Sequence, residues 1–231
     1  MNKKLHHFIG DFDLLKSELL IQDPEIRHQI RRVLKLKVGE QIVLSDGRSS
    51  EATAVIEAIS DEGVQVSLGQ ATSGVSLDQP NIELALALIK PGLFELAVQK
   101  ATEIGINRII PMTTERTVRI GFKQERLEKI IKEAAEQSEQ VRLPELATPI
   151  NFKEALEFSG DKILFDKSGA AFQKPASGAV RIFIGPEGGF TDAELALAKS
   201  HHCQIVNLGK GVLRAETAAI ISSYLVKSEL S

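Results

Sequence analysis

Hydrophobic and polar positions follow one pattern in the first third of the chain and another in the rest. In the first third, short segments of alternating hydrophobicity lie at Gln41–Leu44, Glu51–Ile59 and Val64–Leu68, separated by turns that contain Asp and Gly. Short alternating strands joined by such turns are typical of an antiparallel meander or a small barrel. Residues 1–72 therefore predict a compact, β-rich domain.

From residue 81 onward the apolar runs become longer and alternate with helical patterns. Ile82–Ile89 is almost continuously apolar, as in a strand that is covered on both faces. The helical stripe behind it is expected to end at Gly105, and a capping box begins a later helix at Thr191. Strands that alternate with helices predict an α/β domain with a mainly parallel sheet over residues 81–231. Further strands are expected at Ile106–Met112, Lys162–Asp166, Val180–Gly185 and Ile205–Leu208, and further helices at Lys123–Gln140 and Ala215–Ser228.

Length and composition fit two folded domains. The chain has 231 residues, of which 43% are hydrophobic and 26% are charged, and these values argue against disorder. Residues 73–80 are small and polar and end in proline, as expected for a linker between the domains. The single cysteine, Cys203, excludes an intrachain disulfide and fits a reducing compartment. We expect this thiol to be buried and inert.

The sequence carries no signal for export or for a membrane. Residues 1–15 contain two lysines but no uninterrupted apolar stretch, unlike a signal peptide. The longest apolar runs fall well short of the roughly 18 residues that a membrane span needs. We therefore expect a soluble, cytoplasmic protein that has no membrane partner.

Net charge is −3, so a nucleic acid would have to bind a local basic patch. The segment Arg27–Lys37 contains five Lys and Arg residues and no acidic one. Read as a helix, it places Ile26, Ile30 and Val33 on a buried side. A solvated helix face is the alternative interpretation, but such faces normally mix both signs of charge, so we favour contact with phosphates. The candidate contacts are Arg27, Arg31, Arg32, Lys35 and Lys37.

Two glycine-rich loops, Gly185–Phe190 and Leu208–Ala218, directly follow expected strands. Glycines at the carboxyl ends of strands in an α/β sheet let main-chain groups approach a ligand closely. Neither loop has the spacing of a triphosphate or dinucleotide cradle, which disfavours those ligands. The alternative is that both loops are tight turns, but turns do not require the charged side chains of Glu187, Arg214 and Glu216.

The sequence predicts no metal site. No cluster of His, Cys, Asp or Glu has the spacing of a set of metal ligands. The histidines outside the basic segment form two adjacent pairs, and residues adjacent in sequence do not share a helix face. We expect surface or packing roles for His6, His7, His201 and His202.

Several segments, in this order, resemble one known family. GPEGGF at 185–190, followed by LGKGVLRAETA at 208–218, resembles the paired C-terminal signature of SPOUT-class methyltransferases. Among these it is most similar to the RsmE family, whose members methylate N3 of a uridine in small-subunit (16S) ribosomal RNA. RRVLKLKVGEQIVLSDG at 31–47 resembles the family's PUA-like RNA-binding domain. KPGLFELAVQKATEIGINRIIPMTTERTV at 90–118 and AAEQS at 134–138 resemble further blocks, so the resemblance covers nearly the whole chain.

Two places depart from the family pattern. An arginine usually follows AAEQS after one residue, but Gln140 stands there and the nearest arginine is Arg142. Whether Arg142 replaces the family arginine stays open. After Lys90 the chain reads Pro-Gly-Leu where Gly-Asp-Arg is more usual, which removes a charge near the expected RNA face.

The resemblance implies a fold, a donor and an assembly. The fold would be an α/β domain with a deep trefoil knot, preceded by a PUA-like barrel, and the protein would be a homodimer. Its partner would be ribosomal RNA, free or within the assembled small subunit. The methyl donor, S-adenosyl-L-methionine, would sit in the knot against main-chain groups of both glycine loops and of a third segment. The residues implied in donor binding are Leu164, Phe165, Gly185, Pro186, Glu187, Gly188, Gly189, Leu208, Gly209, Gly211, Val212 and Leu213.

Methyl transfer from a sulfonium needs positioning more than it needs a metal or a covalent nucleophile. Because the uridine N3 proton must leave, we expect Arg214 to stabilise the developing negative charge. Glu187 or Glu216 would orient that guanidinium or accept the proton. A structural ion pair between Arg214 and Glu216 is the alternative. Arg116 and Arg119 are weaker candidates for RNA contact. Two other functions stay open: a methyltransferase that acts on another RNA or atom, and a non-catalytic RNA-binding protein.

Overall fold

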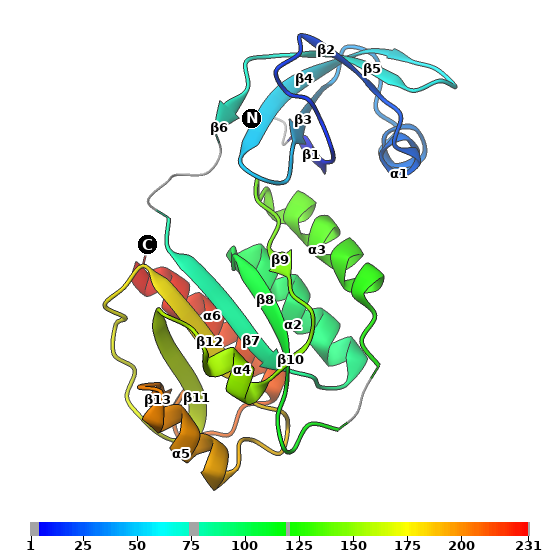
Figure 1. Cartoon of the computed structure of the whole chain (residues 1–231). Helices are drawn as coiled ribbons and strands as arrows, with labels where there is room; N and C mark the ends of the chain where they lie inside the picture. Colours follow the sequence, from blue (N-terminus) through cyan, green and yellow to red (C-terminus); the bar gives the residue numbers. More distant parts are fainter. Residues whose placement is uncertain (1–4, 74–78, 119–120, 231) are drawn as a thin grey trace. The chain divides into compact units, whose positions relative to one another are not determined.

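The computed structural model divides the chain into two compact units (Figure 1). The first unit combines the chain up to Leu77 with Ala135–Leu143, a stretch that the sequence had assigned to the α/β domain. The rest of the chain from Asp78 onward forms the second unit. Residues 74–78 of the expected linker, and Arg119, lie outside the described residues. The structure describes residues 5–73, 79–118 and 121–230.

The first unit is built on a six-stranded mixed sheet in the order β1-β3-β4-β5-β2, with β6 paired to β4. Antiparallel pairing joins β3 to β4 and β4 to β5, which confirms the expected meander. Strand β1 pairs with β3 in parallel. The sequence pattern did not predict β1 and β2, because their residues, HHFI and ELLI, do not alternate between polar and apolar positions. The strands are β1 (His6–Ile9), β2 (Glu18–Ile21), β3 (Gln41–Ser45), β4 (Ser50–Ile59), β5 (Val64–Leu68) and β6 (Thr72–Ser73).

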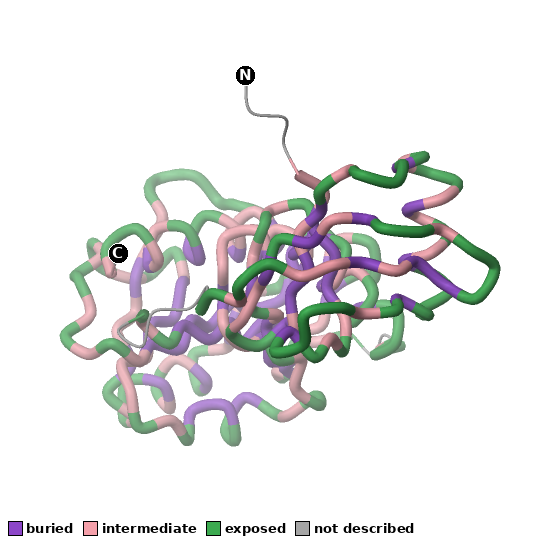
Figure 2. Tube along the Cα trace, turned by 90° about the horizontal axis from the view of Figure 1, so that it is seen from above, coloured by how far each residue is buried: buried purple, intermediate pink, exposed green. Residues whose placement is uncertain are grey.

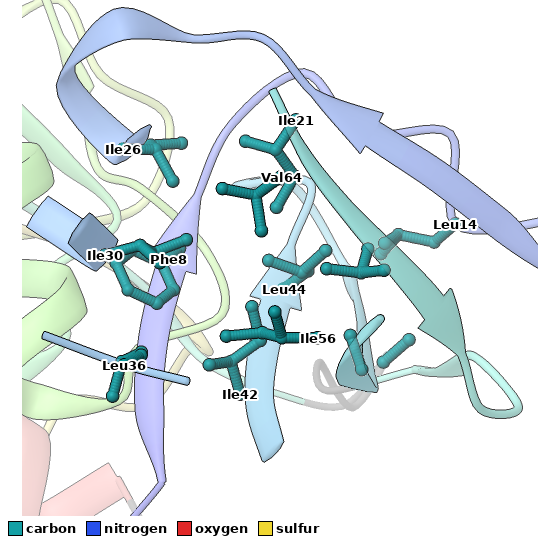
Figure 3. Packing of buried hydrophobic residues seen from close by; sticks show 13 residues of the cluster. Phe8, Leu14, Ile21, Ile26, Ile30, Leu36, Ile42, Leu44, Ile56 and Val64 are labelled. Carbon is teal, nitrogen blue, oxygen red and sulfur yellow. The ribbon is translucent and has the colours of Figure 1, made fainter. Parts of the chain in front are cut away.

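Alternating strand residues and one helical stripe form the core of this unit. Figure 3 shows Phe8 of β1 beside Ile30, with Ile42 and Leu44 of β3 and Ile56 of β4 grouped next to them, and each of these side chains is at most 1% exposed. Residues two apart in a strand point to the same face, which places Ile42 and Leu44 on the inner side of the sheet. Burying such a side chain contributes about 1.5–3 kcal/mol, so this cluster holds the helix on the strands.

The basic segment begins as the short helix α1 (Pro24–His28) and continues directly into a π-helix, η1 (Gln29–Val33), where a single α-helix was expected. Ile26 and Ile30 are buried, as predicted. Val33 is 62% exposed, so the prediction that it is buried was wrong. The wider turn of a π-helix rotates later residues away from α-helical spacing, and this rotation brings Val33 to the surface.

The stretch Ala135–Leu143 attaches to the first unit through hydrogen bonds. The N–H of Ile9 donates to Oε1 of Glu136 over 2.9 Å in a buried position. The N–H of Leu143 donates to the carbonyl of Gly47, also over 2.9 Å. Glu136 belongs to the AAEQS block, so at least part of that block has a structural role.

The second unit has a seven-stranded parallel sheet in the order β10-β8-β7-β12-β11-β13, with β9 beside β8. This arrangement confirms the expected α/β fold with a parallel sheet. Helix α2 packs against α6 on one face, and α4 packs against α5 on the other (Figure 1). The strands are β7 (Asn81–Ala87), β8 (Arg108–Thr113), β9 (Glu145–Leu146), β10 (Ile150–Asn151), β11 (Asp161–Ala170), β12 (Ala179–Ile184) and β13 (Gln204–Val206). The helices are α2 (Pro91–Ile104), α3 (Gln124–Ser138), α4 (Phe152–Leu156), α5 (Asp192–Ser200) and α6 (Ala215–Leu230).

Helix α2 illustrates how the sequence pattern becomes packing. Phe94, Ala97 and Ala101 recur at helical spacing and are buried, and Gly105 ends the helix at a φ of +86°. In each unit the buried positions lie in the interior, whereas the outer loops are mostly exposed (Figure 2). Within the described part of the chain, no helix is both long enough and apolar enough to cross a membrane.

Candidate active site

Strands β12, β11 and β13 are neighbours and parallel, so their carboxyl ends meet at one edge of the sheet. One glycine loop leaves that edge after β12 and the other after β13. Both loops open into a single cavity of about 390 Å³. Phe165, Asp166 and Lys167 of β11 form a third part of its wall. The topology therefore brings together three separate segments of the chain between Phe165 and Ala218.

Most residues that the sequence pointed to for donor binding and catalysis line this cavity, and two do not. Leu164 is 0% exposed and belongs to the hydrophobic core of the second unit. Glu216 is 7% exposed and is not part of the lining. The proposed residues that do line the cavity are Phe165, Gly185, Pro186, Glu187, Gly188, Gly189, Leu208, Gly209, Gly211, Val212, Leu213 and Arg214, together with Arg116.

Backbone conformation explains two of these glycines. Gly189 has a φ of +68° and Gly209 a φ of +111°, in the left-handed region that residues with a Cβ rarely adopt. At Gly209, no heavy atom of the surrounding structure lies within 4 Å of the place where a Cβ would stand. The main chain at this loop is therefore accessible from the cavity.

The first glycine loop is anchored at its far end. Phe190 is 5% exposed, and its ring centroid lies 5.1 Å from that of Phe152. Thr191 and Glu194 form the predicted capping box at the start of α5, which confirms that expectation. In this capping box Oε2 of Glu194 accepts the N–H of Thr191, and Oε1 of the same carboxylate accepts the N–H of Glu115 over 3.0 Å. One buried carboxylate thus joins the loop to the segment after β8.

Arg116 holds the same loop from the β8 side. Its Nη1 donates to the carbonyl of Gly188 over 2.6 Å and to that of Phe190 over 3.3 Å. The sequence suggested that Arg116 contacts RNA, whereas in the structure its guanidinium binds the loop. No local sequence signal could have indicated this contact, because Arg116 and Gly188 are 72 positions apart.

Asn207 holds the second glycine loop and was not predicted. Its Nδ2 donates to the carbonyl of Gly169 over 2.5 Å, and its Oδ1 accepts the N–H of Gly209 over 3.2 Å. Gly169 itself lies so close to β13 that a Cβ there would be 2.5 Å from the backbone of Val206. The end of β11 and the start of the second loop are therefore tightly joined.

Charged side chains at the cavity differ in their exposure and in their hydrogen bonding. Arg214 and Glu187 are exposed, and neither has a hydrogen-bond or ion-pair partner within the described residues. The alternative ion pair between Arg214 and Glu216 is not formed there, and Oε2 of Glu216 is buried without a partner. Asp166 is half-buried. Its Oδ1 accepts two hydrogen bonds from Ser168, one from the N–H (2.9 Å) and one from the serine hydroxyl (2.6 Å).

Cys203 is 7% exposed at the entrance to β13, where the sequence placed it. Burial raises the pKa of its thiol to about 12, so the thiol stays protonated and unreactive at neutral pH. No group of three or more His, Cys, Asp or Glu side chains that could hold a metal occurs in the described ranges. His7 is also buried, with Nε2 3.6 Å from the carboxylate of Glu51.

The basic segment of the first unit divides into two groups. Arg27 donates through Nη2 to the carbonyl of Asp61 over 2.6 Å, and Arg31 forms an ion pair with the Asp61 carboxylate at 3.2 Å. These two arginines therefore hold the turn between β4 and β5. The side chains left exposed are those of Arg32, Lys35 and Lys37.

Comparisons with known proteins agree with this geometry. The family described as RNA methyltransferase domain matches residues 77–227, and the family described as RNA methyltransferase PUA domain matches residues 21–69. The chain is 34% identical to the ribosomal RNA small subunit methyltransferase E of Rickettsia conorii over 202 residues, which cover 84% of this chain and 82% of that protein. It is 28% identical to the Bacillus subtilis protein of the same name, with 88% of each chain covered.

A solved structure has a similar fold over nearly the whole chain. The ribosomal RNA small subunit methyltransferase E of Neisseria gonorrhoeae, bound to S-adenosyl methionine, superposes with a TM-score of 0.88 at 25% identity, covering 97% of this chain and 98% of that one. With the family matches, this likeness extends over both units of the chain. The chain therefore belongs to the ribosomal RNA small subunit methyltransferase E family of RNA methyltransferases.

Proposed function

We propose that the chain transfers a methyl group from S-adenosyl-L-methionine to N3 of a uridine in small-subunit ribosomal RNA. The observation that carries this proposal is that two glycine loops open into one cavity at the carboxyl edge of the sheet, with the exposed guanidinium of Arg214 beside them. The names of the relatives and the donor bound to the Neisseria enzyme support the choice of substrate and donor. A purely RNA-binding protein would have no use for this cavity.

The residues present fit such a donor. A volume of about 390 Å³ lies within the range of about 300–1,000 Å³ that is common for ligand sites. The main chain at Gly209 has open space where a Cβ would stand, so its backbone is accessible and suits the polar edge of an adenine. Phe165 and Leu213 supply apolar surface for its ring. Leu164, which is buried in the core, would not contribute its side chain.

Residue roles follow from accessibility. When bound, the sulfonium donor supplies a methyl group that is already activated for in-line displacement. Arg214 stabilises the negative charge that develops on a uridine oxygen as N3 loses its proton. We assign proton acceptance to Glu187, which is exposed at the cavity, rather than to Glu216, which is buried away from it. The N3–H bond would break and its proton would pass to the Glu187 carboxylate, while N3 bonds to the methyl carbon. The bond between that carbon and the donor sulfur would break at the same time, and its electron pair would stay on sulfur.

The wider assembly is part of the same proposal. We assign RNA docking to residues 1–72 and catalysis to a trefoil-knotted domain at 81–231, within a cytoplasmic homodimer. The exposed Arg32, Lys35 and Lys37 are the first-choice phosphate contacts, whereas Arg27 and Arg31 already bind the turn at Asp61. For the dimer, support comes from two apolar side chains on the outer face of α6, which are exposed to 42% (Ile221) and 66% (Tyr224).

Donor binding and methyl transfer test the proposal separately. Calorimetric titration with S-adenosyl-L-methionine should show binding, and tritiated donor should label a uridine in ribosomal RNA. Arg214→Ala should abolish transfer but change donor affinity by no more than a few-fold. Lys210→Ala is the matched control, because Lys210 is exposed in the same loop but does not line the cavity, and it should keep the wild-type kcat. No donor binding would refute the enzyme assignment, and full turnover by Arg214→Ala would remove that residue from the mechanism.

A further inference from the structure

A second cavity, of about 190 Å³, opens in the second unit between the start of α2 and the start of α3. It shares no lining residue with the donor cavity. Most of its lining residues are apolar, and they include the buried Phe94 and the half-buried Phe122. Lys123 and Arg126 are exposed and line its mouth. The proposed methyl transfer, as described above, does not use this cavity.

The second cavity lies at the edge of the sheet where α/β proteins commonly bind ligands. Leu88 and Ile89, which line it, directly follow β7, so it opens at the carboxyl edge, as the donor cavity does. Ligands of open α/β sheets bind outside the carboxyl ends of the strands, and this cavity lies there, behind β7.

The charges at the mouth favour an anionic ligand. Glu95 is the acidic residue of the lining, and its carboxylate is bound by Arg126, with Nε at 2.5 Å and Nη2 at 2.7 Å. The hydrogen bond from Arg126 lowers the pKa of Glu95, which keeps this pair ionised. The guanidinium plane is thereby fixed in place while 62% of the Arg126 side chain remains exposed. Lys123 adds a further positive charge.

A pocket that combines apolar and aromatic side chains with cationic ones matches one part of an RNA molecule. Single-stranded RNA is recognised by unstacking its bases onto aromatic rings or arginine planes while cations hold the phosphates. We propose that this second cavity takes an unstacked nucleobase from a nucleotide that flanks the reacting uridine, with Lys123 at the adjoining phosphate. This inference rests on the proposed RNA methyl transfer and adds a second point at which substrate RNA is held.

A base-deletion experiment tests the site. The probe is a short single-stranded RNA with one uridine, together with copies in which each flanking nucleotide in turn is made abasic. One abasic copy should bind the wild-type protein about tenfold more weakly than the parent RNA does, as expected for the loss of one stacked base. Phe122→Leu, which keeps bulk but removes the ring, should lose a similar factor with the parent RNA. With that abasic copy, the variant should lose nothing more.

Matched variants separate stacking from charge and from misfolding. Phe122→Tyr should bind the parent RNA as the wild type does. Val118→Ala is the control, because Val118 is 71% exposed in the same connection but does not line the cavity. Lys123→Ala should weaken every RNA alike and lower the salt dependence by about 0.7 in log–log slope. Each variant is first checked for wild-type donor affinity, which depends on the other cavity.

The outcomes distinguish this inference from the proposed function. If the wild type methylates RNA but Phe122→Leu binds the parent RNA normally, the base site is wrong and the function stands. The site is equally wrong if the variant loses the same factor with the abasic copy as with the parent. If the protein neither binds nor methylates any RNA, the proposed function fails and the base site fails with it.

Discussion

Replacing Arg116 with alanine removes two hydrogen bonds from the first glycine loop, those that reach the carbonyls of Gly188 and Phe190. Hydrogen bonds from a charged group contribute about 1.5–3 kcal/mol when buried. Because Arg116 is exposed, we take the lower end of that range, about 1.5 kcal/mol for the pair. The donor would then have to order a loop that the wild type holds in place. A cost of that size corresponds to about tenfold weaker donor binding.

The assay is calorimetric titration of Arg116→Ala with S-adenosylhomocysteine, combined with initial rates of methyl transfer at saturating donor. The KM for the donor should rise about tenfold while kcat stays close to that of the wild type, because Arg116 touches the loop and not the reacting atoms. Glu115→Ala is the matched control: the structure uses the N–H of Glu115 but not its carboxylate, so this variant should bind normally.

Two results would refute this reasoning. If Arg116→Ala binds the donor normally but unfolds at a lower temperature, the contact stabilises the fold without preparing the site. If kcat falls at saturating donor while the KM is unchanged, Arg116 acts on the RNA or on the transition state instead. The second result would restore the role that the sequence suggested.

Three further predictions concern stability and reactivity. Gly169→Ala should lower the free energy of unfolding by about 1–3 kcal/mol in urea titrations, because the new Cβ would be 2.5 Å from the Val206 backbone, whereas Gly178→Ala, which has open space, should change it by less than about 0.5 kcal/mol. Cys203, whose pKa burial raises to about 12, should not react with a disulfide reagent at pH 8 until the protein is unfolded, and rapid labelling of the native protein would contradict its burial. Burial lowers the pKa of His7 despite the carboxylates of Glu51 and Glu139, so the unfolded chain binds the proton more readily. Stability should therefore be complete above about pH 6.5 and decline as pH falls below it, and His7→Gln should flatten this decline in urea titrations.

Periodicity was enough to predict the elements whose pattern extends over several residues. The meander, helix α2 with its Gly105 terminus and the capping box at Thr191 all follow from local rules that the structure obeys. The short strands β1, β9 and β10 were not predicted, because the HHFI of β1 does not alternate between polar and apolar positions and two residues are too few to show a period. The π-helix was missed because its wider turn leaves no mark in composition, and Val33 was misplaced for that reason.

The sequence pattern also did not predict a buried ion pair between two strands. Glu83 lies within an almost continuously apolar run, yet it is 6% exposed and binds Arg181, its register partner on the neighbouring strand. The pairing depends on the order of the strands, which the pattern of one strand does not contain. A charge inside an apolar run was the available signal, because a buried charge requires a partner.

The candidate site was predicted as two loops, but not as a cavity. Glycine composition and the charged residues Glu187 and Arg214 identified the loops, because both features are local. Arg116 is 72 positions from Gly188, so its contact with the first loop could not be read from the sequence. Asn207 directly precedes the second loop, and its contact with Gly169 depends on the order of the strands, which the sequence pattern does not contain. Glu216 looked equivalent to Glu187 in the sequence, and only the packing of α6 shows that it is buried.

Hydrogen bonds join Ala135–Leu143 to the strands near the start of the chain, and they limit where the chain can be cut to isolate its first unit. A fragment that stops at residue 72 would carry strands β1 to β5 but would lack the acceptor for the N–H of Ile9 and the carbonyl that the Ser45 hydroxyl reaches. Such a fragment would expose polar groups and apolar surface that the intact chain covers. The first unit therefore cannot be transferred to another protein as one continuous segment. A graft would also need the nine residues Ala135–Leu143, which the chain supplies much later.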